Sequence, residues 1–123
     1  MKVLMIDDEP SRAKILRNHG LLNCDITIAL GFDQLEFYLD GGLHSFDLIL
    51  LDHDMRDQIN GYDVCEQFLI ERNIPVIIIS TNEPASKRML GLLEEYGVDA
   101  VYAPITRPAD LIQEIRKYRK ETK

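Results

Sequence analysis

Residues 3–10 read VLMIDDEP, so that four apolar residues lead directly into three acidic residues and a proline. A short apolar run that ends at a turn signal predicts a strand buried on both faces of a sheet. Two later stretches repeat the pattern, because residues 46–52 read FDLILLD and residues 75–80 read PVIIIS. Buried strands of this kind need helices on both faces of a parallel sheet, and the segments between them should supply those helices.

Amphipathic stretches do separate the buried runs. Their apolar spacing predicts helices, and Gly20 and Gly97 stand where two of these helices should stop. Strands are predicted over residues 3–6, 25–29, 46–51, 75–79 and 98–102, and helices over residues 11–19, 32–39, 62–69, 87–96 and 107–120, the last capped by Thr106. This alternation predicts an α/β fold, a (βα)5 doubly wound, flavodoxin-like parallel sheet of five strands in the order 2-1-3-4-5.

The composition indicates one small acidic domain. The 123 residues include 21 acidic and 14 basic side chains, which give a net charge of -7. This balance argues against direct binding to nucleic acid and against docking on an anionic membrane. The sequence has no apolar run long enough to span a membrane and no signal peptide. Its two cysteines, Cys24 and Cys65, exclude a disulfide framework, so we expect a cytoplasmic protein with reduced, buried thiols.

Acidic side chains follow two strands that the predicted order makes neighbours. Asp7 and Asp8 come after the first strand, and Asp52 comes after the third. Three carboxylates at one edge of the sheet repel one another unless a cation lies among them, and oxygen ligands of this kind suit Mg²⁺. A hydroxyl from Ser80 or Thr81, after the fourth strand, could donate to a bound oxyanion. The pattern suits phosphoryl transfer to Asp52, whereas capping of the following helix is the alternative role for either acid of the pair.

At this point the sequence resembles the receiver domain of two-component response regulators, from Met1 to about Lys120. The resemblance rests on the stretches that end the predicted strands, together with the residues beside them: 3–10, 46–55, 61–63, 74–80 and 103–105. It implies a signalling module that binds Mg²⁺ and accepts a phosphoryl group from a histidine kinase or a phosphotransfer protein. Asp7 and Asp8 would hold Mg²⁺ with Asp52 as the phosphoacceptor, the backbone carbonyl of Asp54 would complete the metal site, and Ser80 would bind the phosphoryl oxygen.

The chain departs from the family pattern at the site itself. The family carries a lysine before the proline that follows strand five, and Ala103 stands there in this sequence. Arg56, Lys87 and Arg107 are the cations nearest the site by sequence, and Arg56 replaces the usual proline. His53, between Asp52 and Asp54, stands where an apolar residue is usual, and we favour a structural role for it over that of a transition-metal ligand.

The resemblance covers one receiver-like domain, residues 1–123, and we expect no output domain. A downstream protein partner would then bind the face from Ser86 to Lys120, with no direct contact to nucleic acid or membrane. The chain would be no enzyme beyond self-catalysed phosphoryl transfer to Asp52 and hydrolysis from it. Two alternatives stay open: a non-phosphorylated adaptor with a receiver fold, favoured by Ala103, and a haloacid dehalogenase-like phosphatase that uses Asp52 and Asp54.

Overall fold

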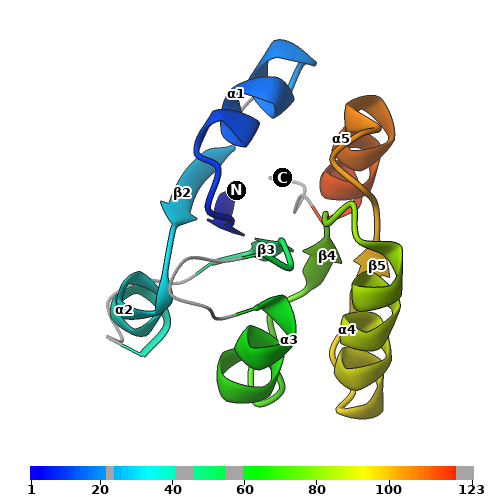
Figure 1. Ribbon diagram of the computed structural model, residues 1–123. Helices are drawn as coiled ribbons and strands as arrows, with labels where there is room; N and C mark the ends of the chain where they lie inside the picture. Colours follow the sequence, from blue (N-terminus) through cyan, green and yellow to red (C-terminus); the bar gives the residue numbers. More distant parts are fainter. Residues whose placement is uncertain (22–23, 41–45, 55–59, 119–123) are drawn as a thin grey trace, which may run out of the picture.

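The computed structural model describes residues 1–21, 24–40, 46–54 and 60–118, and these form a three-layer α/β fold. Its sheet has five parallel strands in the order β2-β1-β3-β4-β5, as the sequence predicts (Figure 1). The strands are β1 (Lys2–Ile6), β2 (Asp25–Ala29), β3 (Leu48–Leu51), β4 (Val76–Ile78) and β5 (Ala100–Tyr102).

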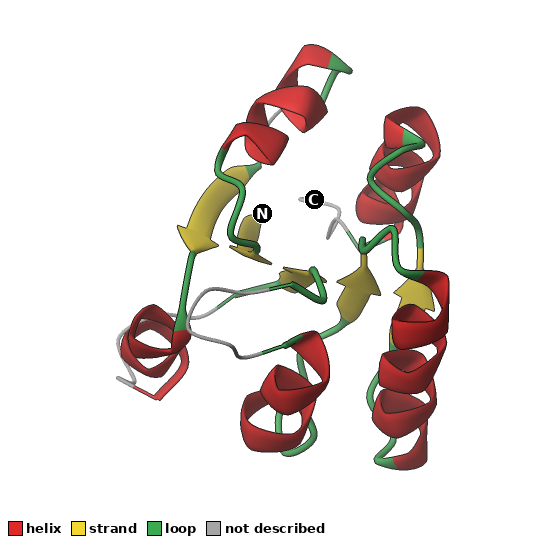
Figure 2. Cartoon of the chain, in the orientation of Figure 1, coloured by secondary structure: helices red, strands yellow, loops and turns green. Residues whose placement is uncertain are grey.

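Helices follow each strand and lie on both faces of the sheet (Figure 2). They are α1 (Ser11–Asn18), α2 (Phe32–Leu35) with the π-helical segment η1 (Glu36–Asp40), α3 (Gly61–Val64) with the π-helical segment η2 (Cys65–Leu69), α4 (Glu83–Glu95) and α5 (Pro108–Lys117). Helices α1 and α5 cover one face, and α2, α3 and α4 cover the other. None of these described helices is long and apolar enough to cross a membrane.

Strand β1 shows how the apolar run supplies two hydrophobic cores at once. Because side chains alternate along a strand, Val3 and Met5 pack with α1 and α5, while Leu4 and Ile6 pack with α2, α3 and α4. All four side chains are fully buried. The edge strand β2 has one neighbour, β1, and its residues are mostly half-buried, in agreement with its alternating sequence.

The structure corrects three details of the prediction from sequence. Helix α4 begins at Glu83 rather than Lys87, because the side chain of Asn82 accepts the backbone N–H of Ala85 and caps the helix one turn earlier. Helix α5 begins at Pro108, and Arg107 rather than Thr106 occupies the cap position, with no side-chain cap. Of the two thiols, Cys65 is buried, which raises its pKa to about 12, but Cys24 is only half-buried.

Gly61 fixes the segment after β3 against the start of α3. Its backbone N–H donates to the carbonyl of His53 over 2.6 Å. A Cβ atom at this position would overlap the backbone oxygen of Asp52 and would lie 2.6 Å from Sδ of Met89. The backbone that carries Asp52 can therefore approach α3 closely because residue 61 has no side chain.

We expect Gly61→Ala to lower the free energy of unfolding by about 1–3 kcal/mol, because the added methyl group forces the backbone at Asp52 or Met89 to move. Gly91→Ala is the matched control, since Gly91 lies in the middle of α4 and a Cβ there meets nothing within 4 Å. Alanine should stabilise that helix by about 0.5–1 kcal/mol. Urea unfolding of both variants would measure the difference, and equal effects would contradict the close-approach argument.

Candidate functional site

The carboxyl ends of β1 and β3 bring three aspartates together, as the sequence analysis expects. Ile6 pairs with Leu51 in the sheet, so Asp7 and Asp52 follow at neighbouring positions. Backbone hydrogen bonds hold both residues in place: Asp7 donates to Ala29 over 3.1 Å, and Asp52 donates to Ile6 over 2.9 Å. Asp7, Asp8 and Asp52 each offer a carboxylate oxygen, and these oxygens lie within 4.8 Å of one another.

Asp7 does not cap the following helix. Its Oδ1 accepts the backbone N–H of Glu9 over 2.8 Å, whereas α1 starts at Ser11 behind Pro10 and has no side-chain cap. The capping alternative is therefore wrong for this residue, and its carboxylate instead faces the cluster. Asp7 and Asp52 are buried and Asp8 is half-buried, so most of the cluster is shielded from solvent.

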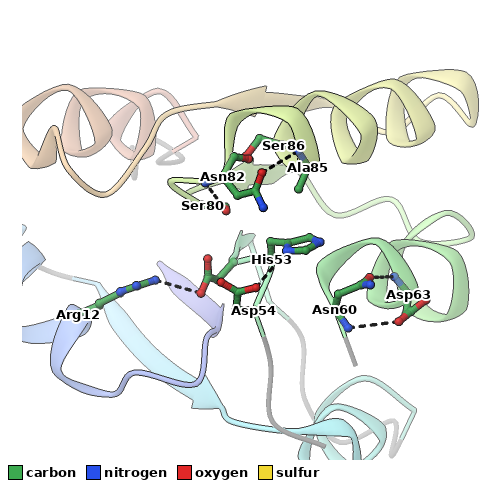
Figure 3. A network of polar contacts seen from close by, with 10 residues as sticks. Arg12, His53, Asp54, Asn60, Asp63, Ser80, Asn82, Ala85 and Ser86 are labelled. Atoms are coloured by element: carbon green, nitrogen blue, oxygen red, sulfur yellow. Dashed lines mark hydrogen bonds and ion pairs between the residues drawn. The ribbon is translucent and has the colours of Figure 1, made fainter. Parts of the chain in front are cut away.

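Arg12 is the cation that the described part of the chain brings to this site, and the sequence analysis missed it. Its Nη1 lies 3.1 Å from Oδ2 of Asp7 and 3.0 Å from Oδ2 of Asp52. Figure 3 shows the Arg12 side chain pointing toward the segment that carries His53 and Asp54. Arg12 is the second residue of α1, one turn after the acidic segment, which lets the side chain return over the end of the sheet. The position of Arg12 could have indicated its role from sequence. A cation in the first turn of a helix interacts unfavourably with the helix dipole, so another contact is expected to stabilise it there.

Of the three cations nearest by sequence, the two that the structure describes do not take this place. Lys87 is exposed and pairs with Glu83 over 3.3 Å. Arg107 lines a separate pocket of about 530 Å³ with Thr81, Glu83, Tyr102, Pro104 and Thr106. Arg56 lies outside the described residues, as does the adjoining Met55.

Burial dominates the electrostatics of the cluster. The pKa of Asp7 is raised to about 6, chiefly by burial and also by the charge of Asp52, against the lowering effects of the Glu9 N–H and Arg12. Burial also raises the pKa of Asp52, with smaller contributions from Asp54 and Asp8. Among the described residues, three carboxylates lie beside one guanidinium, so this part of the site has an excess of negative charge. A second cation with a preference for oxygen ligands therefore fits it.

Asp54 and His53 lie beside the cluster rather than in it. His53 Nδ1 is 3.1 Å from Oδ1 of Asp54, whose side chain is 79% exposed. Asp54 also forms an isolated antiparallel bridge with Asn60. Among the described residues, the group of potential side-chain metal ligands at this edge contains the three aspartates and no histidine. A ligand role for the Asp54 backbone carbonyl stays a prediction.

Ser80 is the buried hydroxyl after β4, whereas Thr81 is exposed. The Oγ of Ser80 accepts a hydrogen bond from the backbone N–H of Asn82 over 3.0 Å, which leaves the hydroxyl free to act as a donor through its proton. Figure 3 shows Ser80 above the segment that carries His53 and Asp54. Ala103 follows β5, where its N–H donates to Ile78 over 3.0 Å and its buried methyl group supplies no charge.

We expect Asp7→Asn to raise the free energy of unfolding at pH 7 by about 1–3 kcal/mol in the absence of divalent cations. The raised pKa means that folded Asp7 holds its proton more tightly than the unfolded chain does. Its contribution to stability is thus present below about pH 4 and is lost as the pH rises through about 6. Asparagine does not ionise, so the variant does not lose this stability as the pH rises.

Urea unfolding in the presence of EDTA, near pH 4 and near pH 7, would measure this gain. The exposed Asp25, at the opposite end of the sheet, supplies the control variant Asp25→Asn, which should change stability by no more than about 0.5 kcal/mol. A loss of stability in Asp7→Asn at both pH values would show that the ion pair with Arg12 outweighs the burial of charge.

Comparisons with known proteins agree with this geometry. The family model of the response regulator receiver domain matches residues 3–116. The response regulator ArlR of Staphylococcus saprophyticus is 31% identical over 121 residues, which cover 96% of this chain and 50% of that protein. A probable transcriptional regulator, ycf27 of Cyanidium caldarium, is 34% identical over 99 residues, covering 79% and 37%. The chain thus spans half or less of the length of these relatives.

Solved structures show the same fold at lower identity. The BeF3-activated receiver domain of Klebsiella pneumoniae RstA superposes with a TM-score of 0.73 at 22% identity, covering 98% of this chain and all of that one. The Mn(2+)-bound form of the response regulator Rcp1 gives a TM-score of 0.68 at 16% identity, covering 94% and 91%. The family match over most of the chain, together with the strand order and the acidic cluster, shows that this chain belongs to the receiver domain family of two-component response regulators.

Proposed function

We propose that this receiver domain binds Mg²⁺ among Asp7, Asp8 and Asp52 and accepts a phosphoryl group on Asp52 within a phosphorelay. The observation that carries the proposal is the buried position of Asp52 among carboxylate oxygens that lie within 4.8 Å of one another. Such a site concentrates negative charge that a divalent cation would neutralise. The Mn(2+)-bound Rcp1 and the BeF3-activated RstA domain support both parts of the proposal by analogy of fold.

In the proposed reaction, a carboxylate oxygen of Asp52 attacks the phosphorus atom of a phosphohistidine on the partner. The P–N bond breaks as the new P–O bond forms, and the histidine nitrogen leaves with the electron pair. Bound Mg²⁺ would neutralise charge on the transferring group. The hydroxyl of Ser80 would donate a hydrogen bond to a phosphoryl oxygen, since its own oxygen already accepts from the backbone N–H of Asn82.

Ala103 weakens this reaction. A lysine at that position would contribute a charge-assisted contact of roughly 1.5–3 kcal/mol to the phosphorylated state. Its absence should slow transfer, or reduce the phosphorylated fraction, by about one to two orders of magnitude. This substitution is also the observation that favours the second candidate function, an adaptor with a receiver fold that is never phosphorylated.

The phosphatase alternative has less support from the geometry. It requires the Asp54 carboxylate to act as an acid and a base beside Asp52, yet that carboxylate is 79% exposed and contacts His53. We therefore propose that the chain has no turnover beyond self-catalysed phosphorylation and dephosphorylation of Asp52. Its partners would be a histidine kinase or phosphotransfer protein and a downstream protein that docks between Ser86 and Lys120, a face whose last two residues lie outside the described structure.

Acetyl phosphate with Mg²⁺, followed by intact mass measurement, tests the proposal. We expect a single phosphoryl adduct on the wild-type chain and on Asp25→Asn, and none on Asp52→Asn, because the amide has no nucleophilic carboxylate. Beryllofluoride with Mg²⁺ should raise the melting temperature of the first two proteins only.

Two results would contradict this proposal in different ways. If neither an adduct nor a beryllofluoride effect is observed, the adaptor function is left. Continuous release of phosphate from p-nitrophenyl phosphate, lost in Asp54→Asn, would instead establish the phosphatase.

A further inference from the structure

We propose that Arg12 is a built-in cation that competes with a divalent metal ion for Asp7 and Asp52, so that metal binding requires the guanidinium to leave the two carboxylates. This inference rests on the metal site of the proposed function and adds a residue that sets its affinity. It follows from the contacts of Asp7, from the charges in the pocket and from the exposure of Arg12.

Both oxygens of Asp7 are already engaged. Oδ1 accepts the N–H of Glu9 over 2.8 Å, and Oδ2 accepts from Nη1 of Arg12 over 3.1 Å. The Glu9 bond belongs to the backbone of the segment that follows β1, so it persists as long as that segment keeps its conformation. The Arg12 contact is the one that a single side-chain rotation can remove. Metal entry at Asp7 would therefore act on Arg12 first.

The guanidinium and a metal ion cannot share these oxygens without strong repulsion. Mg²⁺ binds carboxylate oxygens at about 2.0–2.1 Å. An ion at that distance from Oδ2 of Asp7 would lie no more than about 5 Å from Nη1 of Arg12. The same holds at Asp52, because the same Nη1 contacts Oδ2 of that residue over 3.0 Å. Like charges at this separation repel strongly in a partly buried site.

Arg12 has a route out of the pocket, whereas the carboxylates do not. The Arg12 side chain is 26% exposed, but those of Asp7 and Asp52 are 0% and 5% exposed. Arg12 also lies in the first turn of α1, before the first buried residue of that helix, Ala13. Its long side chain can thus move into solvent while the sheet and both cores stay closed. The guanidinium stabilises the carboxylates when no metal is bound, and the metal replaces it when present.

Titration with Mn²⁺ or Mg²⁺ alone, by isothermal calorimetry, tests the competition. We expect Arg12→Gln to lower the dissociation constant by about tenfold or more, because a charge-assisted contact no longer has to be broken. Arg17→Gln is the matched control: it removes the same charge from an exposed position in the last turn of α1 and should leave the affinity unchanged. Arg12→Lys keeps the charge on a single amine, so its affinity should lie between those of the wild type and Arg12→Gln.

The outcomes separate this inference from the proposed function. If the wild type and Arg12→Gln bind the metal equally well, the competition is wrong and the metal site stands. If neither binds, the metal site itself is wrong, and the competition falls with it. Should Arg12→Gln fail to fold, an Arg12→Lys affinity equal to that of the wild type would overturn the competition.

Discussion

The contact of one guanidinium with two buried carboxylates is the interaction on which the rest of the site depends. The ends of β1 and β3 are fixed by the sheet, and apolar side chains fill both of its faces. The backbone therefore holds Asp7 and Asp52 next to each other at this edge. Burial raises the pKa of both, and Arg12 offsets only part of the charge. The described part of the site thus carries more negative than positive charge. A cation-binding site needs such an excess, whereas a purely structural ion pair would avoid it.

Residues beside this site connect it to the helices that pack next to it. On one side, Gly61 lets the backbone at Asp52 pack against α3 and Met89 of α4. On the other, Ser80 accepts the N–H of Asn82, and the Asn82 side chain in turn caps α4 through Ala85. Ser80 and the start of α4 are therefore joined by two consecutive hydrogen bonds. Under the proposed function, a new contact of Ser80 would reach the cap of α4, the helix in which the proposed partner-binding face begins.

The fold was predictable from sequence because its central strands, β1, β3 and β4, are buried on both faces. Runs such as residues 3–6 have no amphipathic alternative, and the chain order of strands and helices leaves few topologies. Helix boundaries were less predictable, because periodicity marks where a helix is buried rather than where it starts. The start of α4 is set by a cap, Asn82, one turn before the apolar stripe begins. Similarly, π-helical segments continue α2 and α3 without a change in hydrophobic pattern.

The difference between strands and helices also explains which site residues could be predicted from the sequence. Asp7, Asp8, Asp52 and Ser80 come directly after strands, and parallel strands end at a common edge, so position in the chain implies proximity. Arg12 reaches this edge from a helix, by the length of its side chain, and no rule about strand ends includes it. A search for unpaired cations in the first turns of helices that follow acidic segments would have included it.

Ala103 and Arg12 together change the side from which a positive charge approaches Asp52. A cation at residue 103 would follow β5, which is separated from β3 by β4, and would approach Asp52 from the side of Ser80. Arg12 approaches from α1, beside β1, and contacts Asp7 as well as Asp52. A charge on the β5 side can complement a metal ion, because the two would contact different oxygens. A charge on the β1 side engages oxygens that the metal would need. The proposed site thus exchanges cooperation between cations for competition, and phosphorylation would then require a higher concentration of free metal.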